Sequence, residues 1–83
     1  QWRGDFVAVT MTEFLLLEAL AGRPGYAKSR EQLLEIGYNN DDFVEDRVID
    51  SHIKRLRRKF RAVDPNFEAI ETLYGIGYKF DPT

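Results

Sequence analysis

Apolar residues recur every three or four positions between Asp46 and Val63, the spacing that makes one face of an α-helix apolar. At about 100° per residue, one group of apolar side chains falls within a sector of about 60° and is expected to face the core: Ile49, Ile53, Leu56 and Phe60. Asp46 is in position to cap the start of this helix. The residue before a proline disfavours helical geometry, so Pro65 predicts that the helix ends near Ala62 or Val63.

Two shorter helices are predicted upstream, and each begins with a capping box. Residues 10–13 (Thr-Met-Thr-Glu) form the first box, in which the threonine hydroxyl accepts from the N–H three residues on and the glutamate reaches back. The leucine-rich helix that follows is expected to stop at Gly22 and Pro24. Residues 29–32 (Ser-Arg-Glu-Gln) form the second box, and the short helix after it is expected to have Gly37 as its C-cap.

Three segments have the composition of β-strands. Residues 6–9 (Phe-Val-Ala-Val) follow a turn-like segment and predict one short strand. Residues 68–73 and 78–80 flank a glycine-containing loop and predict a hairpin, with Ile76, Tyr78 and Phe80 on one face. Turn residues and three acids predict a loop over residues 37–45. The predicted fold is therefore α+β, in the order strand, three helices, hairpin.

Composition removes several classes of function. The 83 residues, 43% of them hydrophobic, suit one small domain, and the absence of cysteine excludes disulfides, a thiol nucleophile and a thiolate zinc site. The apolar run at 14–17 is far shorter than the roughly 20 residues of a membrane span, so no membrane contact is expected. The acids of residues 41–46 lack the glycine-centred spacing of a calcium loop, and no phosphate-binding glycine loop or nucleophile motif occurs. We therefore expect no metal, no cofactor and no enzymatic activity.

Charge is distributed unevenly along the chain. Seven basic residues and one acid between Arg47 and Arg61 give +6, whereas the whole chain carries −2, so the other 68 residues carry −8. The third predicted helix has its polar face opposite the apolar stripe, at Arg47, Ser51, Lys54 and Arg58. A cationic stripe attracts a polyanion through its local field even when the net charge is negative. The alternative interpretation is a solvated helix face.

The order of the elements gives this stripe a function. A two-stranded hairpin is marginally stable alone, so it is expected to pack on the helices. If the second and third helices form a helix-turn-helix with the hairpin beside them as a wing, the third helix presents its cationic side as a rod that fits the DNA major groove. Sequence-specific binding of double-stranded DNA is the leading hypothesis. The alternatives are a winged helix that binds an acidic protein and a winged helix that binds RNA.

Four segments extend this hypothesis to a known family. They are Val-Thr-Met-Thr-Glu-Phe-Leu-Leu-Leu at 9–17, Ser-Arg-Glu-Gln-Leu-Leu at 29–34, Asp-Arg-Val-Ile-Asp-Ser-His-Ile-Lys-Arg-Leu-Arg-Arg-Lys at 46–59, and Ile-Glu-Thr-Leu-Tyr-Gly-Ile-Gly-Tyr-Lys-Phe at 70–80. In register over nearly the whole chain, they resemble the winged-helix effector domain of OmpR/PhoB-type bacterial response regulators. The stretches 53–65 and 71–78 look most similar to the ChvI-type regulators of alphaproteobacteria.

The resemblance implies a cytoplasmic transcription factor module that binds tandem DNA half-sites. It implies that the loop between the second and third helices faces RNA polymerase, through Asn39, Asn40, Asp41 and Asp42. It also implies a full-length protein that dimerises when a cognate sensor histidine kinase phosphorylates its receiver domain. Two departures from the family are expected: the receiver domain is absent from this chain and the N-terminal sheet is truncated, and Tyr74 stands where the family has a wing arginine.

Helix register and resemblance together give the residues expected to contact DNA: Arg47, Ser51, His52, Lys54, Arg55, Arg57, Arg58, Thr72, Tyr74 and Tyr78. Several of them have structural alternatives. Arg57 points sideways, as do Lys59 and Arg61 outside this set, and these three could either contact phosphate or pair with acids such as Asp50, Glu68 or Glu71. A lone histidine at the core boundary, such as His52, is often structural. The hairpin side chains could equally pack on the third helix or, at Tyr74, cap the turn.

Overall fold

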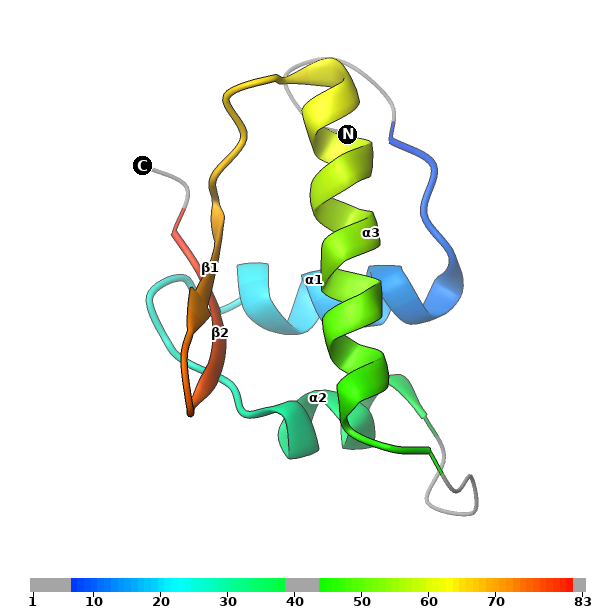
Figure 1. The fold of residues 1–83 in the computed structure, drawn as a ribbon, viewed down its shortest axis with the longest axis vertical. Helices are drawn as coiled ribbons and strands as arrows, with labels where there is room; N and C mark the ends of the chain where they lie inside the picture. The colour runs from blue at the N-terminus through cyan, green and yellow to red at the C-terminus, as the bar shows by residue number, and fades with distance from the viewer. Residues whose placement is uncertain (1–6, 39–43, 82–83) are drawn as a thin grey trace.

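The computed structural model describes residues 7–38 and 44–81 of the chain. Three helices, α1 (Met11–Ala21), α2 (Arg30–Gly37) and α3 (Arg47–Val63), precede two strands, β1 (Ile70–Leu73) and β2 (Gly77–Phe80). Figure 1 shows α3 as the long axis of the molecule, with α1 and α2 crossing it and the hairpin standing at its side. This is the predicted winged helix-turn-helix, with the hairpin as the wing.

Both predicted capping boxes are confirmed. The Thr10 hydroxyl accepts from the Glu13 N–H at 3.1 Å, and the Glu13 carboxylate accepts from the Thr10 N–H at 2.8 Å. Ser29 and Gln32 make the same reciprocal pair at 3.2 and 2.8 Å. At the start of α1 and of α2, two backbone N–H groups are therefore satisfied by side chains that the sequence alone identifies.

The sequence predicted Gly37 as the C-cap of α2, and this prediction is wrong. It is the last helical residue, and Tyr38, in extended geometry, occupies the C-cap position. A Cβ at Gly37 would lie 3.3 Å from the Thr12 side chain and 3.4 Å from that of Leu16. The glycine therefore allows α2 to pack closely on α1.

The start of α3 also differs from the prediction. Asp46 occupies the N-cap position, but its backbone is helical (φ −63°, ψ −24°) and its side chain makes no capping hydrogen bond. A capping side chain turns back to the first N–H groups from an extended backbone, which Asp46 lacks. The predicted end of the helix at Val63 is confirmed.

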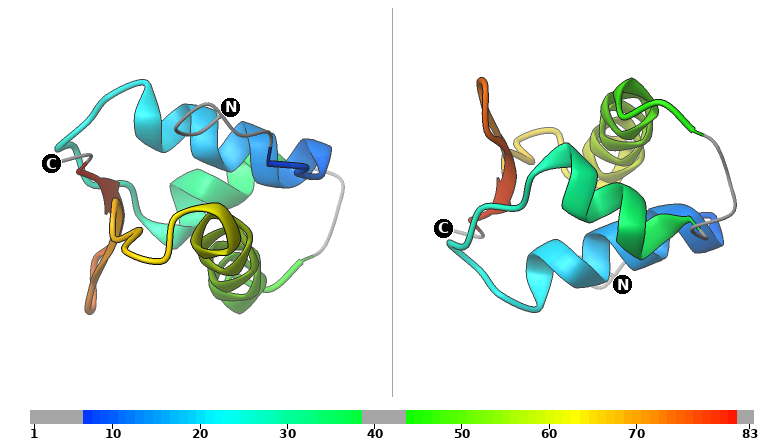
Figure 2. Two further views of the ribbon diagram at one scale, coloured as in Figure 1. Left: turned by 90° about the horizontal axis from the view of Figure 1, so that it is seen from above. Right: turned by 90° about the horizontal axis from the view of Figure 1, so that it is seen from below.

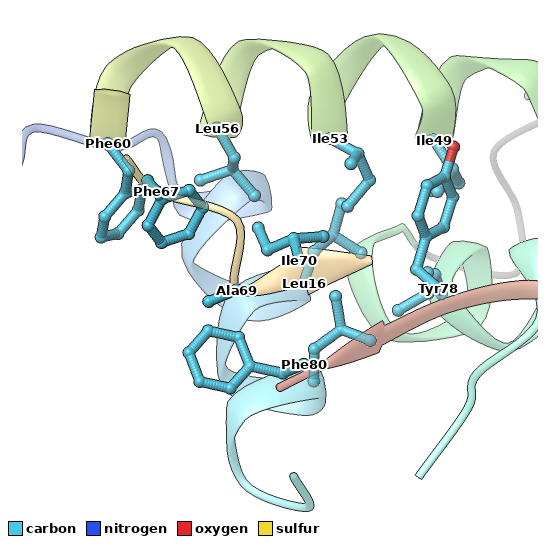
Figure 3. Packing of buried hydrophobic residues seen from close by; sticks show 12 residues of the cluster. Leu16, Ile49, Ile53, Leu56, Phe60, Phe67, Ala69, Ile70, Tyr78 and Phe80 are labelled. Carbon is cyan, nitrogen blue, oxygen red and sulfur yellow. The ribbon is translucent and has the colours of Figure 1, made fainter. Parts of the chain in front are cut away.

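The apolar stripe of α3 forms the centre of the core. All four of its side chains, Ile49, Ile53, Leu56 and Phe60, are buried, together with Leu16, Leu20, Leu33, Phe67, Ala69, Ile70, Tyr78 and Phe80. Figure 3 shows the stripe meeting side chains from the hairpin and the segment before it. The rings of Phe60 and Phe67 stack at 4.9 Å between centroids. One continuous cluster thus joins the three helices to the wing.

The wing is an antiparallel pair in which Ile70 faces Phe80 and Leu73 faces Gly77. Its first strand is shorter than predicted, beginning at Ile70. Tyr78 and Phe80 are buried as expected, but Ile76 is 62% exposed because it lies in the turn, where side chains do not alternate between two faces. The other edge of β2 meets the segment before α2 through two backbone hydrogen bonds between Lys28 and Tyr78, at 2.8 and 2.9 Å.

The predicted strand over residues 6–9 does not form over residues 7–9, and Phe6 lies outside the described residues. In the described ranges, the only strands that form a sheet are those of the wing, so no part of the expected truncated N-terminal sheet is present there. A strand requires a hydrogen-bonding partner, and composition alone supplies none. Val7 and Val9 instead pack against the core as irregular chain.

Figure 2 views the molecule from both ends of α3: α1 and α2 lie to one side of that helix, and the wing stands beside them. The face of α3 turned away from α1 and α2 is therefore left uncovered by the other helices. Over residues 7–38 and 44–81, no helix has the length and apolar content that crossing a membrane requires.

Candidate nucleic-acid interface

The uncovered side of α3 carries a group of exposed polar and basic side chains, which we call the cationic face: Arg47, Ser51, Lys54, Arg55 and Arg58. They project away from the buried stripe, as the helical projection predicts. Among the described residues, Lys54, Arg55 and Arg58 make no hydrogen bond or ion pair. Three cations are thus available to a ligand at one surface.

Arg47, at the start of α3, pairs with Glu45 at 2.6 Å. Both side chains are largely exposed, at 80% and 64%. An exposed pair of this kind contributes little stability and exchanges readily for another anion. Arg47 therefore remains compatible with a role at the cationic face.

Three other residues expected at the interface are engaged within the domain. Arg57 donates to the Ile70 carbonyl and to the Thr72 hydroxyl, at 2.8 and 2.7 Å. The Tyr78 hydroxyl donates to Asp50. Burial and this hydrogen bond raise the pKa of Tyr78 to about 12, so the hydroxyl stays protonated at neutral pH. In the free domain, Thr72 and Tyr78 therefore contact α3, which is the structural alternative considered for them from the sequence.

His52 lies between α2 and α3, half-buried. Its Nε2 is 2.5 Å from the Tyr38 hydroxyl, and its Nδ1 is buried with no partner among the described residues. Burial and the nearby charge of Arg55 lower the pKa of His52 below the ordinary value of 6.5. This shift favours the neutral ring, and the contact with Tyr38, the C-cap residue of α2, links α3 to the end of α2.

The sideways cations Arg57, Lys59 and Arg61 have other partners than Asp50, Glu68 and Glu71, the acids considered for them from the sequence. Lys59 instead binds Glu13 of α1, with 2.6 Å between Nζ and Oε1. Arg61 donates to the Phe67 carbonyl at 3.2 Å. The Lys59–Glu13 pair spans 46 residues of sequence, so no local spacing could have revealed it.

Arg30, at the start of α2, is a further residue that the sequence reading missed. It pairs with Asp50 at 3.0 Å and lines a cavity of about 670 Å³ between α2, the first turn of α3 and the wing. The acids Glu31 and Asp46 also line this cavity. Arg30 follows the capping serine directly, and only the pairing of the two helices shows that its partner is Asp50.

The tip of the wing carries no cation. Tyr74 is 91% exposed and Ile76 is 62% exposed, with Gly75 between them at φ +79°. The tip therefore offers an aromatic ring and an aliphatic side chain to a partner. The residues expected to face RNA polymerase, Asn39, Asn40, Asp41 and Asp42, lie outside the described residues.

Comparison with known proteins identifies this architecture. Residues 4–80 match the family described as transcriptional regulatory protein, C terminal. The chain is 46% identical over 80 residues to the transcriptional regulatory protein BaeR of Escherichia coli O6:H1, covering 96% of this chain and 33% of that protein. It spans about one third of the length of the curated relatives that it matches.

Solved structures agree with the sequence match. The crystal structure of the DNA-binding domain of Bacillus subtilis CssR superposes with a TM-score of 0.79 at 36% identity, covering 96% of this chain and 85% of that one. The DNA-binding domain of the response regulator AdeR, in complex with an intercistronic region, gives 0.77 at 26% identity, covering 93% and 78%. Sequence and fold together show that the chain belongs to the family of C-terminal domains of OmpR/PhoB-type response regulators.

Proposed function

We propose that this domain binds double-stranded DNA in a sequence-specific manner and controls transcription as the effector domain of a two-component response regulator. The observation that carries the proposal is the set of three exposed cations, Lys54, Arg55 and Arg58, that have no partner among the described residues. An α-helix fits the major groove, and arginine is the side chain that most often reads guanine there. The fold and the relatives named above support the same assignment.

Direct contact is assigned to the exposed members of the expected set: Arg47, Ser51, Lys54, Arg55, Arg58 and, from the wing, Tyr74. Long cations reach phosphates, and a forked guanidinium also reads base edges. The polar groups of His52, Thr72 and Tyr78, by contrast, make their hydrogen bonds inside the domain. We assign to them the shaping of the interface, with phosphate contact only where DNA displaces these bonds.

Titration of the domain with selected and random DNA duplexes at two salt concentrations tests the proposal. A sequence-specific reader keeps its preference when salt screens the phosphates, because base contacts are less salt-dependent than phosphate contacts. Arg58→Gln should lower the slope of log K against log salt by about one unit. Arg23→Gln, which removes an exposed cation away from α3, is the matched control and should leave the slope unchanged.

Three results would contradict DNA reading. Equal affinity for selected and random duplexes at both salts would remove sequence specificity. Tighter binding to duplex RNA would favour the RNA-binding alternative, and equal effects of Arg23→Gln and Arg58→Gln would indicate attraction to any polyanion, as expected for an acidic protein partner.

We further propose that the full-length protein acts in the cytoplasm, that a sensor histidine kinase phosphorylates its receiver domain, and that it dimerises on tandem half-sites. Membership in the response-regulator family supports this arrangement. The ChvI-type subclass remains our proposal on the similarity of residues 53–65 and 71–78. Preference for the operators of a ChvI-type regulator over those of a BaeR-type regulator tests the subclass.

We propose that Asn39, Asn40, Asp41 and Asp42 contact RNA polymerase. The carboxylates of Asp41 and Asp42 would be repelled by phosphate, which favours a protein partner over DNA. Replacing Asp41 and Asp42 by Asn in the full-length protein should leave operator affinity nearly unchanged and alter transcription activation. Equal losses of both would contradict a separate role for the loop.

A further inference from the structure

Two side chains of α3 reach from the helix to the wing. Asp50 and Arg57 are seven residues apart, which is about two helical turns, so they lie on the same side of α3. The Tyr78 side chain contacts both: its hydroxyl donates to Asp50, and its ring lies 5.7 Å from the Arg57 guanidinium carbon. The second strand of the wing is thus held at two points.

Arg57 also holds the first strand. Its Nε and one terminal nitrogen donate to the Ile70 carbonyl at 3.2 and 2.8 Å, and that nitrogen also donates to the Thr72 hydroxyl at 2.7 Å. The rigid fork of a guanidinium reaches these acceptors from two nitrogens at once, whereas a lysine offers a single nitrogen on a flexible stem. Among the described residues, the edge of β1 that faces away from β2 has no neighbouring strand. Arg57 donates hydrogen bonds to the Ile70 carbonyl of this strand.

Asp50 connects the same contact to α2. Its carboxylate accepts from Arg30 Nε at 3.1 Å and pairs with another Arg30 nitrogen at 3.0 Å, in addition to the Tyr78 hydroxyl. We call Arg30, Asp50, Tyr78 and Arg57 the wing clamp. It joins the start of α2, the first turn and the middle of α3, and both strands of the wing, which are the elements on the proposed DNA side.

Neighbouring arginines of α3 therefore differ in what their side chains do. Arg58 is exposed and makes no hydrogen bond or ion pair with the described residues, whereas Arg57 is half-buried and bonded to the wing. We infer that Arg57 is a positioning residue: it fixes the wing, and so the exposed Tyr74 at its tip, relative to α3, and it does not contact phosphate. This inference rests on the proposed function, because the position of the wing matters through DNA binding.

The wing needs support from outside its own two strands. A two-stranded hairpin alone is marginally stable, and its turn is free of the core. If the clamp is lost, the strands can still pair, but the tip no longer has a fixed distance from α3. Wing contacts with DNA then carry an ordering cost that the clamped domain avoids.

The salt dependence of DNA binding separates positioning from phosphate contact. We expect Arg57→Gln to weaken binding to a selected duplex about tenfold while leaving the slope of log K against log salt unchanged. Arg58→Gln, the matched neighbour, should lower the slope by about one unit. Arg57→Lys keeps the charge but not the fork, so it should weaken binding as Arg57→Gln does. A fall of about one unit in the slope for Arg57→Gln, with Arg57→Lys like the native domain, would overturn the inference.

A double-mutant cycle with Tyr74→Ala tests whether Arg57 acts through the wing. In the Arg57→Gln background, Tyr74→Ala should cost clearly less affinity than in the native domain, because the tip is already displaced. Strictly additive losses would overturn the inference.

Hydrogen exchange in the free domain tests the clamp without DNA. The amides of Leu73 and Gly77 should exchange faster in Arg57→Gln than in the native domain or in Arg58→Gln, and unchanged exchange would overturn the clamp. If the native domain shows no DNA sequence preference, the proposed function fails while this exchange measurement still decides whether the clamp exists.

Discussion

Glu13 shows how one residue can serve two interactions. Its Oε1 atom accepts from the Thr10 N–H at 2.8 Å, which completes the capping box, and from Lys59 Nζ at 2.6 Å. The side chain is fully buried, whereas that of Lys59 is 31% exposed. The same carboxylate therefore starts α1 and ties it to α3.

The pKa of Glu13 reflects opposing effects. Burial raises the pKa, but the hydrogen bonds from Lys59 and Thr10 outweigh it, and the pKa is lowered from its ordinary value of 4.5. An acid whose pKa is lower in the folded state stabilises the fold above its unfolded pKa, and that stability is lost as the pH falls through the folded pKa. Glu13 thus stabilises the domain at neutral pH.

We expect Glu13→Gln to destabilise the domain by about 1–3 kcal/mol at pH 7, because it leaves Lys59 without its buried partner. The loss should shrink as the pH falls below about 4.5, where the native carboxylate also becomes protonated. Denaturant melts of both proteins from pH 7 to about pH 3 measure the difference. Glu18→Gln, on the exposed side of the same helix, is the control. A constant difference at all pH values would contradict the role of the charge.

At the scale of an element, α3 separates stability from binding on its two faces. Leu56 is fully buried and Arg58 is exposed, two residues further along the helix. Leu56→Ala should cost about 2–5 kcal/mol as a large-to-small core change. Arg58→Ala should change the free energy of unfolding by less than about 0.5 kcal/mol and reduce DNA affinity. Urea melts and DNA titrations of both variants measure the two effects. A large loss of stability in Arg58→Ala, or none in Leu56→Ala, would contradict this division between the faces of α3.

Two glycines of the wing, Gly75 and Gly77, are required for different reasons. A Cβ at Gly77 would lie 2.0 Å from the Lys28 carbonyl oxygen, where β2 meets the segment before α2, and the φ of Gly77 is +152°. Gly75 has φ +79°, but a Cβ there would point into open space, with nothing beyond its chain neighbours within 4 Å. Close packing therefore constrains Gly77, whereas backbone conformation alone constrains Gly75.

We expect Gly77→Ala to separate the wing from the segment before α2 and to destabilise the domain far more than Gly75→Ala does. Gly75→Ala should cost only about 1–2 kcal/mol of backbone strain. Thermal unfolding of the two variants gives the comparison, and loss of protection at the Lys28 and Tyr78 amides in Gly77→Ala locates the damage. Similar losses for both variants would show that close packing at Gly77 is unimportant.

The elements differ in how far the sequence predicts them, for physical reasons. Capping boxes and the stripe of α3 are local signals, and the helices they predict are present. A strand depends on a partner elsewhere, so the aromatic and β-branched composition of residues 6–9 was not enough to make a strand of residues 7–9. Exposure along α3 followed from helical periodicity. The bonds from Arg57 to Ile70 and from Lys59 to Glu13 did not, because they depend on how elements pack.

At the scale of the whole molecule, opposite charges are separated between α3 and the rest. The segment from Arg47 to Arg61 carries +6 and the remaining 68 residues carry −8. Part of this positive charge is used internally: Lys59 binds Glu13, and Arg57 and Arg61 bind backbone carbonyls. The cations left for a ligand are those of the cationic face. The acidic remainder favours one orientation of the domain on a polyanion, because other orientations bring like charges together.

This charge distribution predicts how the isolated domain binds DNA. We expect a monomer in solution and weak binding to a single half-site, because without a linked second copy the domain lacks a high effective concentration. Affinity should fall steeply with salt, with Arg47, Lys54, Arg55 and Arg58 each supplying about one unit of the slope when it contacts phosphate. Two half-sites separated by about 10–10.5 base pairs would bring two copies to one face of the duplex. Light scattering of the free domain and titrations across a salt series measure both properties. A stable dimer without DNA, or an affinity indifferent to salt, would contradict this account of the molecule.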